Sequence, residues 1–197
     1  MNPFTIENLI KEGEQEIKEI RGFMLESCER FYLSKDFLNL LDILSDFVFI
    51  RSSRFIMELL QNAEDACMEI GRTNGIFRVI VNDERVRIEH NDKPFDKNDL
   101  RAICGIKSNK KPEKGYIGYL GVGFKSVFKV SDSPMILFGK YWFKFDRNYW
   151  NAENVPWQIT PIPVSSNDTG TILRDSSINE WQNLSRSLIY LLPKIVI

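Results

Sequence analysis

The chain has 197 residues, 43% of them hydrophobic and 12% aromatic, enough to bury the core of one domain or of two small ones. Its 26 lysines and arginines against 27 aspartates and glutamates give a net charge of -1, which excludes a global basic field for nucleic acid or an anionic membrane. The three cysteines form no C-x-x-C pair, so neither a disulfide framework nor a zinc site is predicted and a cytoplasmic setting is expected. The polar, acidic N-terminus and the lack of a long apolar run indicate neither export nor membrane spanning.

The first third of the chain is predicted to be helical. Over residues 5–31 the apolar residues recur at three- and four-residue steps among charges, as in a long amphipathic helix. A second apolar segment begins at Asp36, and a third runs from a serine cap at 52–53 to Gly71.

The pattern then changes to strands. IFRVIVNDERVRIEHND alternates on both sides of an Asn82-Asp83 turn and predicts a half-buried β-hairpin. A short helix over 96–103 and a mobile, lysine-rich loop are expected next. Strands are expected in MILFGKYWFKFD and GTILRD, with an irregular region between them, and a closing helix in NEWQNLSRSLIYLL.

Helices before and after a mostly antiparallel set of strands predict an α+β fold. We expect a two-layer α/β sandwich, with a mixed, mostly antiparallel sheet covered by helices on one face. Residues 1–50 are interpreted as an N-terminal helical extension packed on a main domain of residues 51–197. The final apolar run PKIVI favours the N-terminal part of a longer protein, with a natural end buried in a sheet as the alternative.

The third helix carries a polar row. Glu58, Asn62 and Asp65 stand at i, i+4 and i+7 and therefore project from one face. A solvated face is the usual explanation for such a row on an amphipathic helix. Apolar residues flank the row here, so the alternative is that it lines a cleft.

The stretch GYLGVGFKSVF at 118–128 departs from both common nucleotide-binding loops. In G-x-x-x-x-G-K-[ST] the lysine follows the second glycine directly, whereas Phe124 stands between Gly123 and Lys125. In G-x-G-x-x-G a glycine would replace Ser126. These glycines therefore point to a different phosphate cradle.

In order and spacing, ELLQNAEDA, a hairpin, a lysine-rich loop, GYLGVGFKSVF and TGTIL resemble the ATP-binding domain of the GHKL superfamily, which includes gyrase, the ninety-kilodalton heat-shock chaperones, histidine kinases and MutL. The resemblance covers about residues 51–175. It is strongest to the chaperone branch, whose glycine box reads G-x-F-G-V-G-F, and to the divergent branch of sacsin and the plant protein No Vein. It implies the Bergerat fold and the binding of ATP and Mg²⁺.

The resemblance also implies a role for each motif residue. Glu58 matches the general base that polarises the attacking water, and Asn62 matches the magnesium ligand. Asp65 and Ala66 match positions near the nucleotide, and Thr171 matches a threonine at the adenine edge, with a core strand position as its alternative. The glycine box is expected to contact the phosphates and then to open a helix at about Val122. The residues implied there are Gly118, Gly121, Val122, Gly123 and Phe124.

The lysines have two interpretations each. Lys125 either adds charge at the phosphates or faces solvent. The next residue, Ser126, is expected to cap or pack rather than to bind the nucleotide. The loop lysines resemble the family's ATP lid, with Lys110 as a contact to the nucleotide, and a solvated loop is the alternative. The loop lysines are Lys107, Lys110, Lys111 and Lys114.

The family's D-x-G-x-G motif, whose aspartate accepts the adenine amino group, is altered in this chain. An ungapped alignment places His90 at the aspartate and replaces the two glycines by Asp92 and Pro94. His90 could accept one hydrogen bond, Asn91 could pair with adenine through its amide, and Asp92 could serve if the backbone shifts. A structural role at the strand end is the alternative for His90.

The resemblance implies an ATPase, an ATP hydrolase slow in isolation, in which Mg-ATP closes a lid and drives a chaperone-like conformational cycle. The alternative is a non-hydrolysing nucleotide sensor or a structural scaffold with a degenerate adenine site. Expected partners are ATP, a second copy in an ATP-dependent homodimer, and protein clients, with no membrane and no nucleic acid in this region. A histidine kinase is disfavoured, because His90 is the sole histidine.

Overall fold

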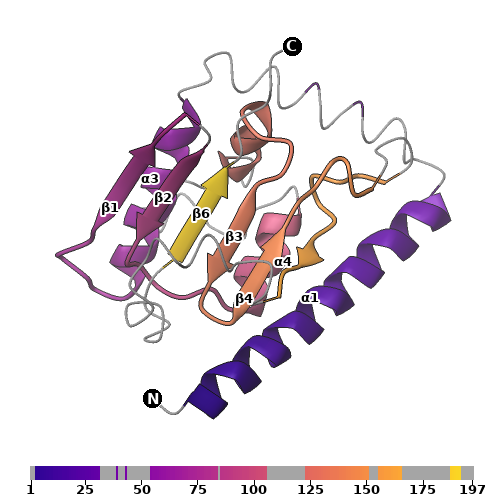
Figure 1. Cartoon of the computed structure of the whole chain (residues 1–197), viewed down its shortest axis with the longest axis horizontal. Helices are drawn as coiled ribbons and strands as arrows, with labels where there is room; N and C mark the ends of the chain where they lie inside the picture. Colours follow the sequence, from indigo (N-terminus) through magenta and orange to yellow (C-terminus); the bar gives the residue numbers. More distant parts are fainter. Residues whose placement is uncertain are drawn as a thin grey trace.

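A computed structural model of the chain describes residues 3–31, 39, 43, 54–83, 85–105, 123–150, 155–165 and 187–191 (Figure 1). Its elements in chain order are α1 (Pro3–Phe31), α3 (Arg54–Glu69), β1 (Phe77–Val81), β2 (Val86–His90), α4 (Lys97–Cys104), the 3₁₀ helix η2 (Gly123–Lys129), β3 (Met135–Phe138), β4 (Tyr141–Lys144), β5 (Ile162–Pro163) and β6 (Ser187–Leu191). The predicted second helical segment, the lysine-rich loop and the predicted strand GTILRD lie outside the described residues.

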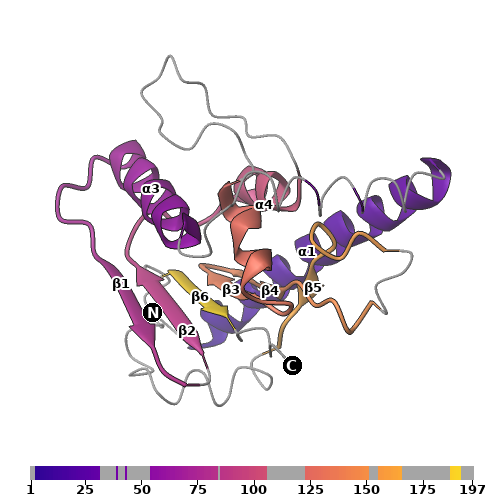
Figure 2. The same ribbon diagram turned by 90° about the horizontal axis from the view of Figure 1, so that it is seen from above.

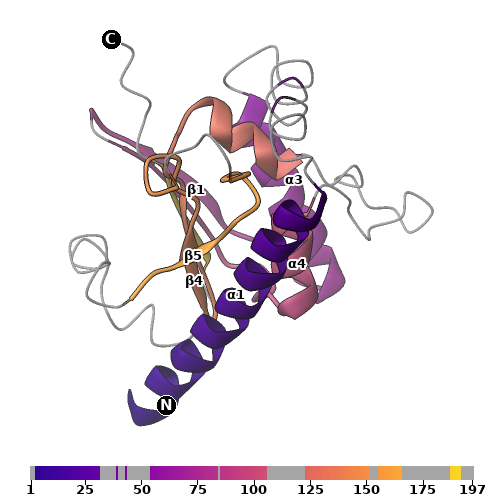
Figure 3. The same cartoon turned by 90° about the vertical axis from the view of Figure 1, so that its right-hand side faces the viewer.

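The described strands form one sheet in the order β1-β2-β6-β3-β4-β5, and every pairing described within it is antiparallel. Figure 3 shows this sheet edge-on with α1, α3 and α4 on the same side. The predicted α+β fold, with helices on one face of a mostly antiparallel sheet, is therefore confirmed. The finer assignment to the Bergerat fold stays a prediction, as does the domain boundary at residues 50–51.

The first and third predicted helices, the short helix and the hairpin that precede the glycine box are confirmed. The two long helices occupy Pro3–Phe31 and Arg54–Glu69, and β1 and β2 pair from Phe77 with His90 to Val81 with Val86. The short helix α4 begins after Asp96, whose side chain accepts hydrogen bonds from two backbone N–H groups of the first turn. This capping box explains why the helix starts there.

The predicted closing helix is wrong where the structure describes it, because Ser187–Leu191 forms β6 in the middle of the sheet. Ile189 pairs with Ile88 of β2 on one side and with Ile136 of β3 on the other, and it is 2% exposed. A short, continuous apolar run such as SLIYL is compatible with a strand buried on both faces as well as with a buried helix. Pairing with β2 on one side and β3 on the other stabilises the strand.

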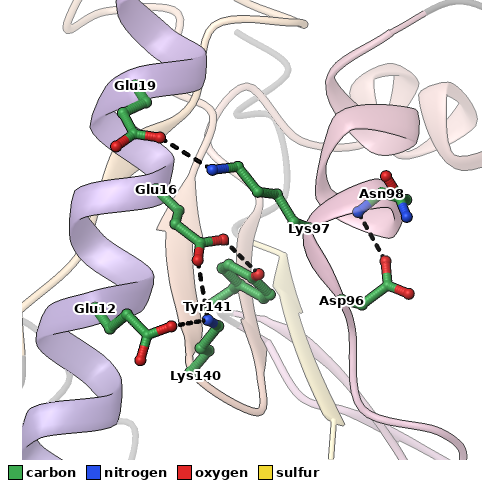
Figure 4. Close-up of polar contacts among 8 residues, drawn as sticks. All are labelled: Glu12, Glu16, Glu19, Asp96, Lys97, Asn98, Lys140 and Tyr141. Atoms are coloured by element: carbon green, nitrogen blue, oxygen red, sulfur yellow. Dashed lines mark hydrogen bonds and ion pairs between the residues drawn. The ribbon is translucent and has the colours of Figure 1, made fainter.

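Helix α1 packs along β4 and β5 and also touches α4. It buries Ile17 and Ile20 in the core, and its carboxylates bind the β3–β4 turn (Figure 4). Lys140 Nζ lies 2.6 Å from a Glu12 oxygen and 3.0 Å from a Glu16 oxygen, and the Tyr141 hydroxyl donates to Glu16 at 2.7 Å. None of the helices in the described ranges has the length and apolar character needed to cross a membrane.

Candidate functional site

The polar row of α3 faces the protein rather than the solvent. Glu58 and Asn62 are half-buried, and Asp65 has no exposed surface. The neighbouring positions Leu59 and Ala63 lie in the core. A solvated face is therefore the wrong explanation of the row. Since burying a carboxylate is costly unless it is compensated, the three side chains need a structural or functional reason to be there.

The structure brings the expected general base to the end of the glycine box. Helix η2 begins at Gly123 and packs against α3, and Figure 2 shows α3, η2 and α4 on the same side of the sheet. A Cβ atom built at Gly123 would lie 2.6 Å from Glu58 Oε2, a distance that real Cβ atoms essentially never show. A side chain at this position would have to displace the Glu58 carboxylate. The other glycine-box positions, together with Lys110 and Thr171, lie outside the described residues; those positions are Gly118, Gly121 and Val122.

The helix expected after the glycine box is confirmed, and it is a 3₁₀ helix that starts at Gly123. Phe124 is 8% exposed and packs against the rings of Phe128 and Phe145 at centroid distances of 6.0 and 6.2 Å. The Ser126 hydroxyl donates to the Gly123 carbonyl at 2.5 Å, so this serine packs and bonds locally, as predicted. Phe124 thus anchors the helix in the core.

Lys125 does not face solvent, which was one of its two expected roles. It is 7% exposed, and its ammonium group donates to the carbonyl oxygens of Ile103 at 2.6 Å and Gln158 at 2.9 Å. Burial lowers the pKa of Lys125 to about 8. The side chain thus lies inside the protein, where two backbone carbonyls compensate its charge.

His90 lies inside the protein at the end of β2. Its ring stacks on Phe77 with centroids 6.2 Å apart and lies 5.1 Å from the ring of Phe138. Its Nδ1 lies 2.8 Å from an Asp92 carboxylate oxygen, and the two side chains are 5% and 4% exposed. These contacts favour the structural role at the strand end over direct contact with a base.

Asn91 and Asp92 have different surroundings. The Asn91 side-chain oxygen accepts from the Ile76 N–H at 2.7 Å, and the Asn91 N–H donates to the Ile76 carbonyl at 3.3 Å, which extends the hairpin. Asp92 lies near α3, because the next residue, Lys93, forms an ion pair with Glu69 of that helix at 3.0 Å. Burial raises the pKa of the Cys67 thiol on α3, and the Asp92 carboxylate raises it further. The altered motif therefore brings one carboxylate to the helix that carries the polar row.

The donor set suits a magnesium ion held mainly by phosphate oxygens and water. Within the described ranges no group of three or more His, Cys, Asp and Glu side chains could hold a metal ion by itself. Asn62 stands one turn from Glu58 on the rigid helix α3, and a single amide oxygen is an adequate protein ligand for Mg²⁺ bound to a nucleotide.

Comparisons with known proteins agree with the motifs. Residues 87–177, under half of the chain, match the family model of the Sacsin domain. The chain is 38% identical to Protein NO VEIN of Arabidopsis thaliana over 107 residues, which is 54% of this chain and 4% of that protein. It is 25% identical to Chaperone protein HtpG of Clostridium botulinum (strain Hall) over 175 residues, 76% of this chain and 28% of HtpG. It is 29% identical to Sacsin of Homo sapiens over 96 residues, 43% of this chain and 2% of sacsin. The chain thus spans a small part of each relative.

Proposed function

We propose that this chain, a divergent sacsin and No Vein-like domain of the GHKL type, binds ATP with Mg²⁺ and hydrolyses it slowly. One observation carries the proposal, the direct approach of Glu58 on α3 to Gly123 at the end of the glycine box. Two motifs from distant parts of the sequence meet in space, and they are the two that catalysis and phosphate binding require.

Glu58 acts in this proposal as the general base. Its half-buried carboxylate is held by a rigid helix beside the backbone that receives the phosphates, so it can orient and polarise a water molecule for attack on the γ-phosphate. Asn62, one turn further along, offers its amide oxygen to Mg²⁺. The magnesium ion, when bound, neutralises charge that develops on the phosphate oxygens.

We assign adenine recognition to Asp92. The Asn91 side-chain oxygen accepts from the backbone N–H of Ile76, just before β1, and the His90 ring packs between aromatic side chains. Asp92 is 4% exposed and lies near α3, the helix that also carries Asp65 and Ala66. A carboxylate there would accept a hydrogen bond from the adenine amino group and would repel the carbonyl oxygen at the same position of guanine.

The wider cycle belongs to the same proposal and is supported by the similarity to the chaperone HtpG. In that cycle the lysine-rich stretch around Lys110 folds over Mg-ATP as a lid, and the closed state drives a chaperone-like change. An ATP-dependent homodimer and protein clients are further parts of it.

The test is a calorimetric titration of the full chain with ATP, with and without Mg²⁺, alongside an assay of phosphate release. We expect magnesium-dependent binding of ATP that GTP does not match. Glu58→Ala should reduce phosphate release at least about hundredfold while ATP affinity stays within about threefold, because the base acts mainly in the transition state. Glu64→Ala, which removes an exposed carboxylate from the same helix, is the control and should change neither quantity. Equal loss of affinity and turnover in Glu58→Ala would remove Glu58 from the role of base.

A second candidate is a nucleotide sensor that binds without hydrolysis, and the altered D-x-G-x-G motif favours it. The same two measurements separate the candidates, since a sensor binds ATP and releases no phosphate even with Glu58 intact. Failure of the unaltered chain to bind either nucleotide would overturn both.

A further inference from the structure

We infer that Lys125 is a positioning residue, whose buried ammonium group holds Gly123, the described end of the glycine box, in place by joining three segments of the chain. The inference rests on the proposed function, because it assigns the support of that same site. The three segments are the end of α4, the helix η2 and the turn at Gln158.

The geometry around the ammonium group is that of a clamp. Nζ donates to the Ile103 carbonyl at 2.6 Å and to the Gln158 carbonyl at 2.9 Å, in a position almost without exposed surface. The rings of Phe128 and Phe145 lie 5.5 and 5.4 Å away and shield the contacts from water. Hydrogen bonds from an ionised donor are strong, and a surrounding of low dielectric strengthens them further.

The clamp acts on the described end of the glycine box, Gly123. The bond from Lys125 to the Ile103 carbonyl joins η2, which begins at Gly123, to the end of α4. Immediately next to Lys125, the Ser126 hydroxyl bonds to the Gly123 carbonyl, and Gly123 touches Glu58. Backbone N–H groups that receive a phosphate must be held to within about 0.5 Å, and this set of contacts can supply such support.

A lysine that only filled the core would be a poor choice at this position. Burying an ammonium group costs free energy, and the lowered pKa of Lys125 is consistent with that cost. An unbranched apolar side chain such as methionine would fill the same volume without the charge. The presence of a charged side chain is explained if its hydrogen bonds hold two backbone carbonyl groups in place. An apolar side chain could not bind these carbonyls.

The experiment compares the affinities of the full chain for ATP and for adenosine by calorimetry. Lys125→Met should weaken ATP binding about tenfold and leave adenosine binding unchanged, because only the phosphates depend on the clamped backbone. Lys129→Met alters another lysine of the same element and should change neither affinity. Ser126→Ala removes the neighbouring bond to Gly123 and should lower the ratio of ATP affinity to adenosine affinity about threefold.

An unchanged ratio of the two affinities in Lys125→Met overturns the inference. This includes an equal loss of both affinities, which would indicate a purely structural lysine. If Lys125→Met does not fold, Ser126→Ala decides, and an unchanged ratio there is the negative result. Failure of the unaltered chain to bind ATP is a separate outcome and refutes the proposed function itself.

Discussion

The buried ammonium group of Lys125 predicts an unusual dependence of stability on pH. Its pKa is about 8 in the folded protein against 10.5 for an ordinary lysine, because burial disfavours the charged form. Between these two values the unfolded chain binds more protons than the folded one. The free energy of unfolding should therefore rise as the pH rises through this window, and the full cost of burying the charge is present below pH 8.

The size of the effect follows from the two pKa values. Their difference corresponds to about 3 kcal/mol in total, most of which is recovered between about pH 7 and about pH 10. Burial raises the pKa of the Cys104 thiol to about 12, so this group destabilises the fold above its ordinary pKa of 9.0. Both proteins contain Cys104, so the comparison with Lys125→Met reduces that opposing contribution, but it does not cancel it, because the Lys125 charge itself lowers the pKa of Cys104.

The assay is urea unfolding at a series of pH values, followed by tryptophan fluorescence. Trp157 is a suitable reporter of unfolding because it is 5% exposed and its ring packs on Phe128. Phe128 belongs to η2, the element of Lys125, and lies four residues after Phe124. The difference in the free energy of unfolding between the unaltered chain and Lys125→Met should change by about 2 kcal/mol in favour of the unaltered chain from about pH 7 to about pH 10. Parallel curves, within about 0.5 kcal/mol, would show that Lys125 is not buried as a charged group.

Two further predictions use glycines at close contacts. A Cβ at Gly13 of α1 would lie 2.0 Å from the Lys140 carbonyl oxygen, whereas one at Gly22 of the same helix would meet nothing within 4 Å. Gly13→Ala should therefore destabilise the fold by about 1–3 kcal/mol while Gly22→Ala stabilises it by up to about 1 kcal/mol, and equal urea midpoints for the two variants would contradict the docking of α1. Gly123→Ala should displace the Glu58 carboxylate and lower phosphate release about hundredfold, with Gly22→Ala as control; unchanged release would separate this contact from catalysis.

The sequence predicted the parts of the site that depend on local spacing. The i, i+4, i+7 row on α3 and the helix after the glycine box follow from periodicity and motif order, and the structure places Glu58 against Gly123. The sequence did not predict what packs against this polar row. A helix of moderate amphipathicity has the same pattern whether its polar side faces solvent or another element. Packing against η2 removes that ambiguity.

Lys125 was missed for a different reason. Lysine is among the residues least often buried, so its position after Phe124 suggested either solvent or phosphate. Five consecutive residues of η2, from Phe124 to Phe128, are buried, and no helical or strand periodicity predicts an element enclosed on all sides. The acceptors of its hydrogen bonds are backbone carbonyls, which any residue type provides, so no sequence signal marks Ile103 or Gln158 as partners.

The contacts of α1 bear on how the chain should be tested. A helix that only lay on a finished domain would keep its contacts at the surface, yet Ile17 has no exposed surface and Tyr141, whose hydroxyl donates to Glu16, is 1% exposed. The Tyr141 and Lys140 partners lower the pKa of Glu16 although burial opposes this, so the stability they provide is present above the ordinary carboxyl pKa of 4.5 and is lost as the pH falls below it. Helix α1 therefore completes the core under β4 and β5. Removing it would expose apolar surface on the sheet that carries the site, and nucleotide binding should be measured on the full chain.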